Sequence, residues 1–500
     1  MRRSAARAAT ALFSLFILAA AAYGTVRVMR SGWLFFYTEG NVMASIGALL
    51  EAGSLAAMYP NDGWTTAPLV MTLYPPIYPV LSAVLASLSD TQTTLFMPRL
   101  VSLGAMLLVI VVLLRLAQQR GVPAWLVAVP LGTLLLAPPV SNLLGAAQVD
   151  VLALCWTVVG VALVVRADEV PASRVWISLP FFLLAFFTKQ SFVAAPAALV
   201  VVLFLDGRRP LALQYAAVLG CAAAVGMLFL DRLTGGGYLM NTVGALTGAT
   251  SASNLITTLA QSRPLQWLPV VLLLLLWALP GFRLGVLELW VLASWILNVA
   301  ATVKVGASVN YLLEPLFALL LLAAVRLPAR PQGHPAVTTR PRAMAWVTAV
   351  LVIWAAAATA PRARQAAGVA RAMWSQGWQI RLDGFEAGYP LVDAQYVPAV
   401  RHEGTLPYLN DTYAFGVLLE VGRWDAAPLL AALRRGDVPF ILTDTDLRLG
   451  TRAEGIAPGA EGFAHFWRIP SIQRAIRDNY ELTTESGPWV WRPKAPVDGE

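Results

Sequence analysis

Apolar runs of about 20 residues recur through the first 360 residues of the chain, and this pattern limits the fold more than any other feature of the sequence. A helix of that length crosses the hydrocarbon core of a bilayer and makes its backbone hydrogen bonds internally. The composition agrees, because 58% of the 500 residues are hydrophobic and only 13% are charged. We therefore predict an α-helical polytopic membrane protein, which excludes a soluble enzyme and a secreted disulfide scaffold.

The runs predict about eleven membrane spans. The first run also resembles a secretory signal peptide, because small residues follow its apolar core, but we favour an uncleaved span that sets the register for the rest. In chain order the predicted spans lie near residues 10–30, 97–115, 124–140, 150–166, 175–188, 191–206, 211–230, 265–281, 285–302, 309–326 and 343–360.

Arginines collect in alternate connections between these spans, as the positive-inside rule expects. The Pro/Arg-rich loop at 328–341 is the richest of the connections predicted to be cytoplasmic. The same pattern places the N-terminus in the cytoplasm, and the long first loop at 31–96 outside the plasma (inner) membrane. The net charge of +8 is therefore a topological signal and gives no indication of nucleic-acid binding.

The last part of the chain, residues 361–500, is mixed and polar in composition. A strand-like run at 438–442 lies between helical patterns at 426–435 and 472–478, which is typical of a small α/β domain. An odd number of spans places this domain outside the cell. We predict two domains: a transmembrane domain at 1–360 with its large first outer loop, and an extracytoplasmic α/β domain at 361–500.

Two acids in this arrangement are candidates for chemistry. Glu39 is the first acid after the first span, and its aromatic neighbours would partly desolvate it, which favours a general-base role. The alternative for Glu39 is a solvated carboxylate at a helix start. Asp150 opens an apolar run, where it either serves a site at the membrane boundary or is simply stabilised by the helix dipole.

Lysine is rare in this Arg-rich chain, which has only Lys189, Lys304 and Lys494. Lys189 falls in a predicted outer turn, against the positive-inside trend, and this favours a use such as binding a phosphate. The alternative is a side chain that extends to the membrane surface and anchors the helix.

No histidine falls near these candidates, so a histidine-ligated catalytic zinc is not expected. The sequence contains no Walker phosphate loop, no GxSxG elbow and no HExxH motif. We predict no cofactor and no resident metal, although oxygen ligands leave a divalent cation held by carboxylates open.

The ordered set of short motifs resembles the GT-C glycosyltransferase superfamily, in particular its bacterial branch that uses polyprenyl-phosphate sugars and includes protein mannosyltransferase and aminoarabinose transferase types. The likeness covers nearly the whole chain in order and topology, although each motif is short and degenerate. The motifs are Tyr37-Thr38-Glu39-Gly40-Asn41, Leu73-Tyr74-Pro75-Pro76-Ile77-Tyr78-Pro79, Met97-Pro98-Arg99-Leu100, Gln148-Val149-Asp150, Thr188-Lys189-Gln190, Asn310-Tyr311-Leu312-Leu313-Glu314 and Leu409-Asn410-Asp411-Thr412-Tyr413.

This resemblance implies an inverting glycosyltransferase that moves a hexose or pentose from a polyprenyl-phosphate donor to a glycan, lipid or protein acceptor at the outer face of the membrane. Glu39 would be the catalytic base, and Asp150 would lie across the site. Because Gly40 stands where many members have a second acid, Asp62 is a further candidate for the base. The donor and its sugar would be bound by Arg99, Lys189, Tyr74, Tyr78, Asn310 and Tyr311.

Several alternatives remain at this stage. Tyr74 and Tyr78 suit interfacial anchoring as well as a sugar pocket. A transporter or flippase of lipid-linked saccharides also needs many spans, but it predicts internal repeats and charged helix centres, whereas the ionisable groups here gather at one face. A ligase or polymerase of lipid-linked glycans differs from the first reading only in its donor.

Overall fold

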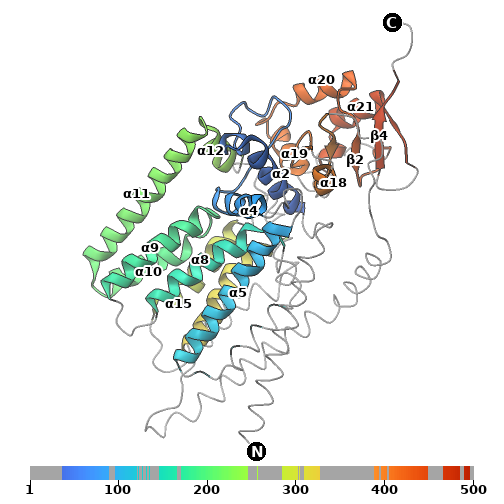
Figure 1. Ribbon diagram of the computed structural model, residues 1–500. Coiled ribbons are helices and arrows are strands. Elements are labelled where there is room, and N and C mark those ends of the chain that lie inside the picture. Colours follow the sequence, from blue (N-terminus) through green and yellow to red (C-terminus); the bar gives the residue numbers. More distant parts are fainter. Residues whose placement is uncertain are drawn as a thin grey trace, which may run out of the picture.

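The computed structural model describes most of the predicted spans and the C-terminal part of the chain (Figure 1). Apart from isolated positions, the described residues are 37–88, 96–120, 146–165, 171–245, 284–301, 303–304, 309–326, 388–393, 396–402, 405–448, 465–484 and 489–495. The helices that coincide with predicted spans are α5 (Phe96–Gln119), α8 (Val149–Val164), α9 (Ala172–Phe186), α10 (Ala194–Leu205), α11 (Arg209–Leu233), α15 (Val286–Ala301) and α16 (Leu313–Arg326).

The predicted spans near 10–30, 124–140, 265–281 and 343–360 lie outside the described residues, apart from isolated positions. Of the described helices, α5 and α11 are long and apolar enough to cross a membrane, and the remaining apolar helices are shorter. The total of about eleven spans therefore stays a prediction.

The helices of this bundle pack through continuous apolar surfaces, and α5, α8, α9, α10 and α15 run alongside one another (Figure 1). Helix α11 differs, because it is apolar but mostly exposed, including Leu213, Val225 and Phe229. A large apolar surface of this kind is unfavourable in water and suits contact with lipid. Pro210 at the start of α11 fixes its first turn, where the missing N–H costs nothing.

Short elements gather at one end of the bundle (Figure 1). They are α2 (Tyr37–Ala52), α3 (Leu55–Met58), α4 (Ile77–Ser87), α12 (Gly237–Leu239) and the π-helix η1 (Met240–Gly244). Gly237 allows α12 to lie against the segment after α3, because a Cβ at this position would come within 1.9 Å of the Tyr59 carbonyl oxygen. The described part of the predicted first loop, residues 37–88, thus contains three helices, α2, α3 and α4.

Beside these elements lies the C-terminal region, which we define as the described residues from 388 to 495. Its four-stranded sheet has the order β1-β2-β4-β3, with β1 and β2 parallel and the other pairs antiparallel. The register pairs Leu391 with Ile441, Leu442 with Val490, and Tyr480 with Pro493. The elements are β1 (Leu391–Val392), α18 (Val397–His402), α19 (Thr412–Glu420), α20 (Ala427–Arg435), β2 (Ile441–Thr443), the 3-10 helix η6 (Phe466–Arg468), α21 (Pro470–Asn479), β3 (Tyr480–Leu482) and β4 (Trp489–Pro493).

The C-terminal region shares a hydrophobic core with the segment between α3 and α4. Leu69 and Leu409 form an isolated parallel β-bridge, and the Asn410 side chain bonds both the N–H and the carbonyl of Met71, at 2.8 and 3.0 Å. Trp424 donates from Nε1 to the Trp64 carbonyl at 3.1 Å. Since buried backbone groups need partners, these bonds fix the C-terminal region on the first loop.

Candidate active site

The predicted site residues lie mostly at the end of the bundle where α2 and α4 meet the C-terminal region. Glu39, Arg99 and Asp150 stand in the first turns of α2, α5 and α8. Lys189 follows α9, and Tyr311 belongs to the 3-10 helix η2 (Val309–Leu312) that precedes α16. The structure thus brings together side chains from five separate parts of the chain, in two clusters with different partners.

In the first cluster, Glu39 and Arg99 are both fully buried and bind each other through two hydrogen bonds. Arg99 Nε lies 2.9 Å from Glu39 Oε1, and Arg99 Nη2 lies 3.0 Å from Oε2. The backbone N–H of Ala147 also donates to Oε1, at 2.6 Å. This bidentate pair connects α2, α5 and the start of α8, and it occupies the guanidinium predicted to bind the donor phosphate.

Tyr78 belongs to the packing behind this pair. Its hydroxyl donates to the Pro98 carbonyl at 2.5 Å and lies 2.8 Å from Ser102 Oγ, and the residue is fully buried. A phenol that is satisfied in this way holds α4 against α5. The structure therefore does not bring Tyr78 to the cavity described below, where a sugar-binding role was predicted for it.

The second cluster is built around a buried ion pair between Lys189 and Asp150, with Nζ 2.5 Å from Oδ1. Asn310 donates to the same oxygen at 3.2 Å, and the Lys189 ammonium lies 4.5 Å from the ring centre of Tyr311. The Asp150 carboxylate and the Tyr311 ring thus hold the ammonium directly, and the Asn310 amide holds the carboxylate. Four residues predicted from the sequence meet here.

Two acceptors of this cluster are unsatisfied among the described residues. Neither Asp150 Oδ2 nor Asn310 Oδ1 has a hydrogen-bond partner there, although both atoms are buried. A buried acceptor without a donor costs free energy, so such atoms commonly mark a place that a ligand or water completes. Lys304 adds a second cation, since burial and then repulsion by Lys189 lower the pKa of its ammonium to about 8.

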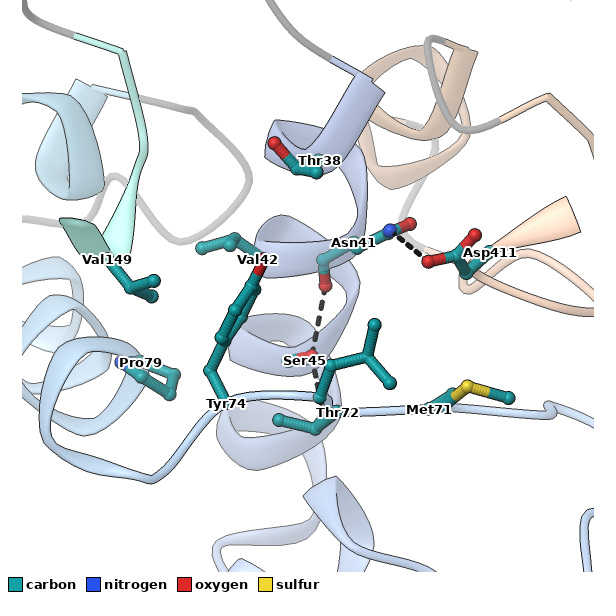
Figure 2. Close-up of a pocket in the computed structure, with 11 residues that line it drawn as sticks. Thr38, Asn41, Val42, Ser45, Met71, Thr72, Tyr74, Pro79, Val149 and Asp411 are labelled. Carbon is teal, nitrogen blue, oxygen red and sulfur yellow. Dashed lines mark hydrogen bonds between the residues drawn. The ribbon is translucent and has the colours of Figure 1, made fainter. Parts of the chain in front are cut away.

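A cavity lies at this end of the bundle, and its lining includes Tyr74 and Val149, the residue directly before Asp150. Burial raises the pKa of Tyr74, and both Lys189 and Asp150 act on it electrostatically, so this lining residue is within electrostatic reach of the cluster. The other described lining residues are Thr38, Asn41, Val42, Ser45, Met71, Thr72, Leu73, Pro79 and Asp411 (Figure 2).

The extended segment along one side of the cavity is held by side chains from distant elements. Two of these side chains bind Thr72. Its N–H donates to Asn241 Oδ1 at 3.2 Å, and its hydroxyl lies 2.7 Å from Ser45 Oγ. Gln190, directly after Lys189, donates to the Leu73 carbonyl at 3.3 Å. Through Gln190, the cavity wall is therefore bonded to the segment that carries Lys189 of the ion pair.

Asp62, the second candidate for the base, lies elsewhere. It is exposed, and its two oxygens accept the backbone N–H groups of Trp64 and Thr66 at 3.0 and 3.1 Å. Asp residues commonly stabilise turns in this way. Asp62 is not among the residues that line the cavity, and its carboxylate stabilises a local turn.

Sequence reasoning missed the far wall of the cavity. There Asn41 donates from Nδ2 to Asp411 Oδ2 at 2.5 Å, across 370 positions of the chain. Both residues stand in motifs that carry the family resemblance, but neither motif indicates that the two meet. The useful signal was the polar face of α2, on which Thr38, Asn41 and Ser45 recur at helical spacing.

In the part of the chain that the structure describes, no group of three or more His, Cys, Asp and Glu side chains is placed to hold a metal ion. The described acids of the site are paired with nitrogen donors instead, as Glu39 is with Arg99 and Asp150 with Lys189.

No protein-family model and no curated protein sequence matches the chain. Solved structures do match. The crystal structure of ArnT from Cupriavidus metallidurans bound to undecaprenyl phosphate has a TM-score of 0.56 and 14% sequence identity, over 98% of this chain and 99% of ArnT. The same protein in the apo state has a TM-score of 0.50 and 15% identity, over 87% of this chain and 93% of ArnT. At this identity the likeness shows a shared fold, and it extends over nearly the whole chain.

Proposed function

We propose that this chain, whose fold is that of the GT-C glycosyltransferases, transfers a sugar from a polyprenyl-phosphate donor to an acceptor hydroxyl. The observation that carries the proposal is the buried Lys189–Asp150 pair, which has an unsatisfied carboxylate oxygen and whose neighbour in the chain, Val149, lines the cavity. ArnT, with the same fold, was crystallised with undecaprenyl phosphate, and a lipid of that kind fits a site at the end of an apolar bundle.

In the proposed reaction the acceptor oxygen attacks the anomeric carbon while the bond from that carbon to the phosphate oxygen breaks, with inversion. The leaving phosphate gains charge, and fixed cations in a partly dry site stabilise it more than water does. Lys189, with Lys304 within electrostatic reach, supplies this charge. The acceptor hydroxyl must lose a proton, and the sequence predicts Glu39 as the base that takes it.

We propose further that the site faces the outside of the plasma membrane and that the acceptor is a glycan, lipid or protein exposed there. The distribution of arginines supports this orientation. Reporter fusions at Gly333 and Gly450, in the Arg-rich loop and the C-terminal part of the chain, should report opposite sides of the membrane. A result with both fusions on one side would contradict the orientation.

The activity can be tested with purified protein in lipid nanodiscs and a panel of undecaprenyl-phosphate-linked hexoses and pentoses. We expect release of undecaprenyl phosphate from one donor and appearance of the sugar on an alkyl glycoside acceptor. Addition of EDTA tests whether a divalent cation takes part. Movement of intact lipid-linked sugar across proteoliposomes, without transfer, would instead support a transporter or flippase.

A further inference from the structure

The cavity beside Tyr74 has two ends with different chemistry. At one end lies Val149, whose neighbour in the chain, Asp150, forms the ion pair with Lys189. Figure 2 shows Asp411 on the opposite side of the cavity from Val149 and Pro79. An inverting transfer needs this arrangement, because the attacking hydroxyl and the leaving phosphate lie on opposite faces of the anomeric carbon.

Asp411 comes from the C-terminal region and is held in place by several contacts. Its Oδ1 accepts the N–H of Ala414 at 2.8 Å and so caps the start of α19. Its Oδ2 faces α2 and accepts from Asn41 Nδ2 at 2.5 Å. The preceding residue, Asn410, is bonded to the backbone of Met71 on the cavity wall. The carboxylate is therefore positioned from both sides of the boundary between the two regions.

The groups around Asp411 suit a hydroxyl-rich molecule. Asn41 is 8% exposed, and its Oδ1 has no hydrogen-bond partner among the described residues. The hydroxyls of Ser45 and Thr72 lie 2.7 Å from each other on the same wall. The ring of Tyr74 forms the neighbouring wall (Figure 2). An aromatic face with a few convergent polar groups is the usual surface of a pocket for a small polar ligand.

We propose that Asp411 is the general base of the transfer. The proposal rests on the proposed function and replaces Glu39 in this role. An Asp411 carboxylate oxygen takes the proton of the acceptor hydroxyl, and the acceptor oxygen forms its bond to the anomeric carbon. The bond between that carbon and the phosphate oxygen breaks, and its electron pair leaves with the polyprenyl phosphate at Lys189.

The protonation behaviour of Asp411 agrees with this role. Burial raises the pKa of its carboxyl to about 7, against the weaker effect of the bond from Ala414. A base is most effective when its pKa lies near the working pH. The titratable neighbour coupled to it is Tyr413, whose pKa burial raises to about 12, so Tyr413 stays neutral. Glu39, in contrast, binds the Arg99 guanidinium through both carboxylate oxygens and also accepts the N–H of Ala147.

Asp411→Asn is the informative substitution, because it removes the basicity and keeps the structural contacts. Asn is as good a helix cap as Asp, and the Asn41 amide can rotate so that its oxygen accepts from the new amide. Asp425→Asn is the matched control. Asp425 also accepts a backbone N–H near a helix start, from Ala427 at 2.9 Å, but it is exposed and distant from the cavity lining.

The experiment measures turnover and binding of undecaprenyl phosphate in the same nanodisc preparations. We expect Asp411→Asn to lower turnover by about 10² or more with unchanged binding, and Asp425→Asn to change neither. Turnover within a factor of about 3 of the unsubstituted protein would overturn the proposal. Absence of transfer by the unsubstituted protein with every donor would instead contradict the proposed function itself.

The pH profile of the unsubstituted protein provides a second test in case Asp411→Asn fails to fold, which a loss of undecaprenyl phosphate binding would reveal. With Asp411 as base, kcat/KM should fall about tenfold for each pH unit below about 7, because the proton then occupies the carboxylate. A profile without this limb between about pH 5.5 and 8.5 would overturn the proposal.

Discussion

Arg99 binds Glu39 through two hydrogen bonds, from Nε to Oε1 at 2.9 Å and from Nη2 to Oε2 at 3.0 Å, and neither side chain is exposed. The Ala147 N–H also donates to the carboxylate, at 2.6 Å. Buried pairs of this kind lose about 3–5 kcal/mol when one partner is removed, because the other charge stays buried without compensation. The pair can therefore be tested as a structural contact.

We expect Glu39→Gln to lower the stability of the protein by several kcal/mol, since it removes the charge that the buried Arg99 guanidinium binds. The double variant Glu39→Gln with Arg99→Met should recover part of this loss, because it removes both charges. Thermal unfolding of detergent-solubilised protein and its accumulation in membranes measure both effects. The interaction free energy follows from the double-mutant cycle.

The same variants separate the two candidates for the base. If Glu39→Gln accumulates with unchanged stability and yet loses about 10² or more in turnover, Glu39 is the base and the role of Asp411 is wrong. If the stability falls and each folded molecule still turns over donor, Glu39 is a structural residue.

A second prediction concerns Lys189. Lys189→Met should weaken binding of undecaprenyl phosphate about 10- to 100-fold, since a charge-assisted hydrogen bond in a buried site contributes about 1.5–3 kcal/mol. Lys189→Met alone leaves the buried Asp150 carboxylate without its ion-pair partner. Asp150→Asn should therefore be added to the same chain. The double variant should fold and still bind weakly.

Lys494→Met is the matched control for this measurement. Lys494 is exposed in the C-terminal region, where its ammonium bonds the backbone carbonyls of Arg477 and Asp478 at 3.1 and 2.7 Å. Its removal should leave lipid binding unchanged. Equal affinities for Lys189→Met, Lys494→Met and the unsubstituted protein would show that Lys189 serves only its ion pair with Asp150 and does not bind the phosphate.

The part of the site that the sequence predicted depends on residues of unusual type or position. Lys189 and Asp150 were identifiable because a charge at the end of an apolar helix is costly and calls for a partner. The structure then pairs these two residues with each other. The role of Arg99 was predicted from a motif alone, and in the structure its guanidinium is bound to Glu39.

Long-range packing decides what the sequence could not predict. The bridge between Leu69 and Leu409 and the bond from Asn41 to Asp411 join segments more than 300 positions apart, and no local periodicity encodes such pairings. The helical periods that predicted α20, α21 and the apolar spans depend only on neighbouring residues. The far wall of the cavity was therefore not predictable, although its residues stand in recognisable motifs.

A third prediction follows for Asp62. Asp62→Asn should change turnover by less than a factor of about 3 and stability by less than about 1 kcal/mol, because Asn forms the same kind of turn. In the structure the carboxylate oxygens of this exposed residue accept the backbone N–H groups of Trp64 and Thr66, which are local turn contacts. A loss of about 10² in turnover, with stability retained, would return Asp62 to the list of candidate bases.

The last prediction concerns the pH dependence of stability in the C-terminal region. Burial raises the pKa of Asp393 to about 6, although Trp467, Asp444 and Thr443 donate hydrogen bonds to its carboxylate. A raised pKa means that the folded state holds the proton more tightly than the unfolded state, whose Asp titrates near 3.9. The stabilisation is therefore complete below about pH 4 and is lost as the pH rises to about 6, at up to about 1.4 kcal/mol per pH unit. Asp411, with its pKa raised to about 7, extends the same trend.

Hydrogen exchange of residues 441–443 should thus accelerate between pH 4 and 6 beyond the intrinsic chemical rate, and Asp393→Asn should flatten this dependence. Protection that increases with pH over the same range in the unsubstituted protein would contradict the prediction.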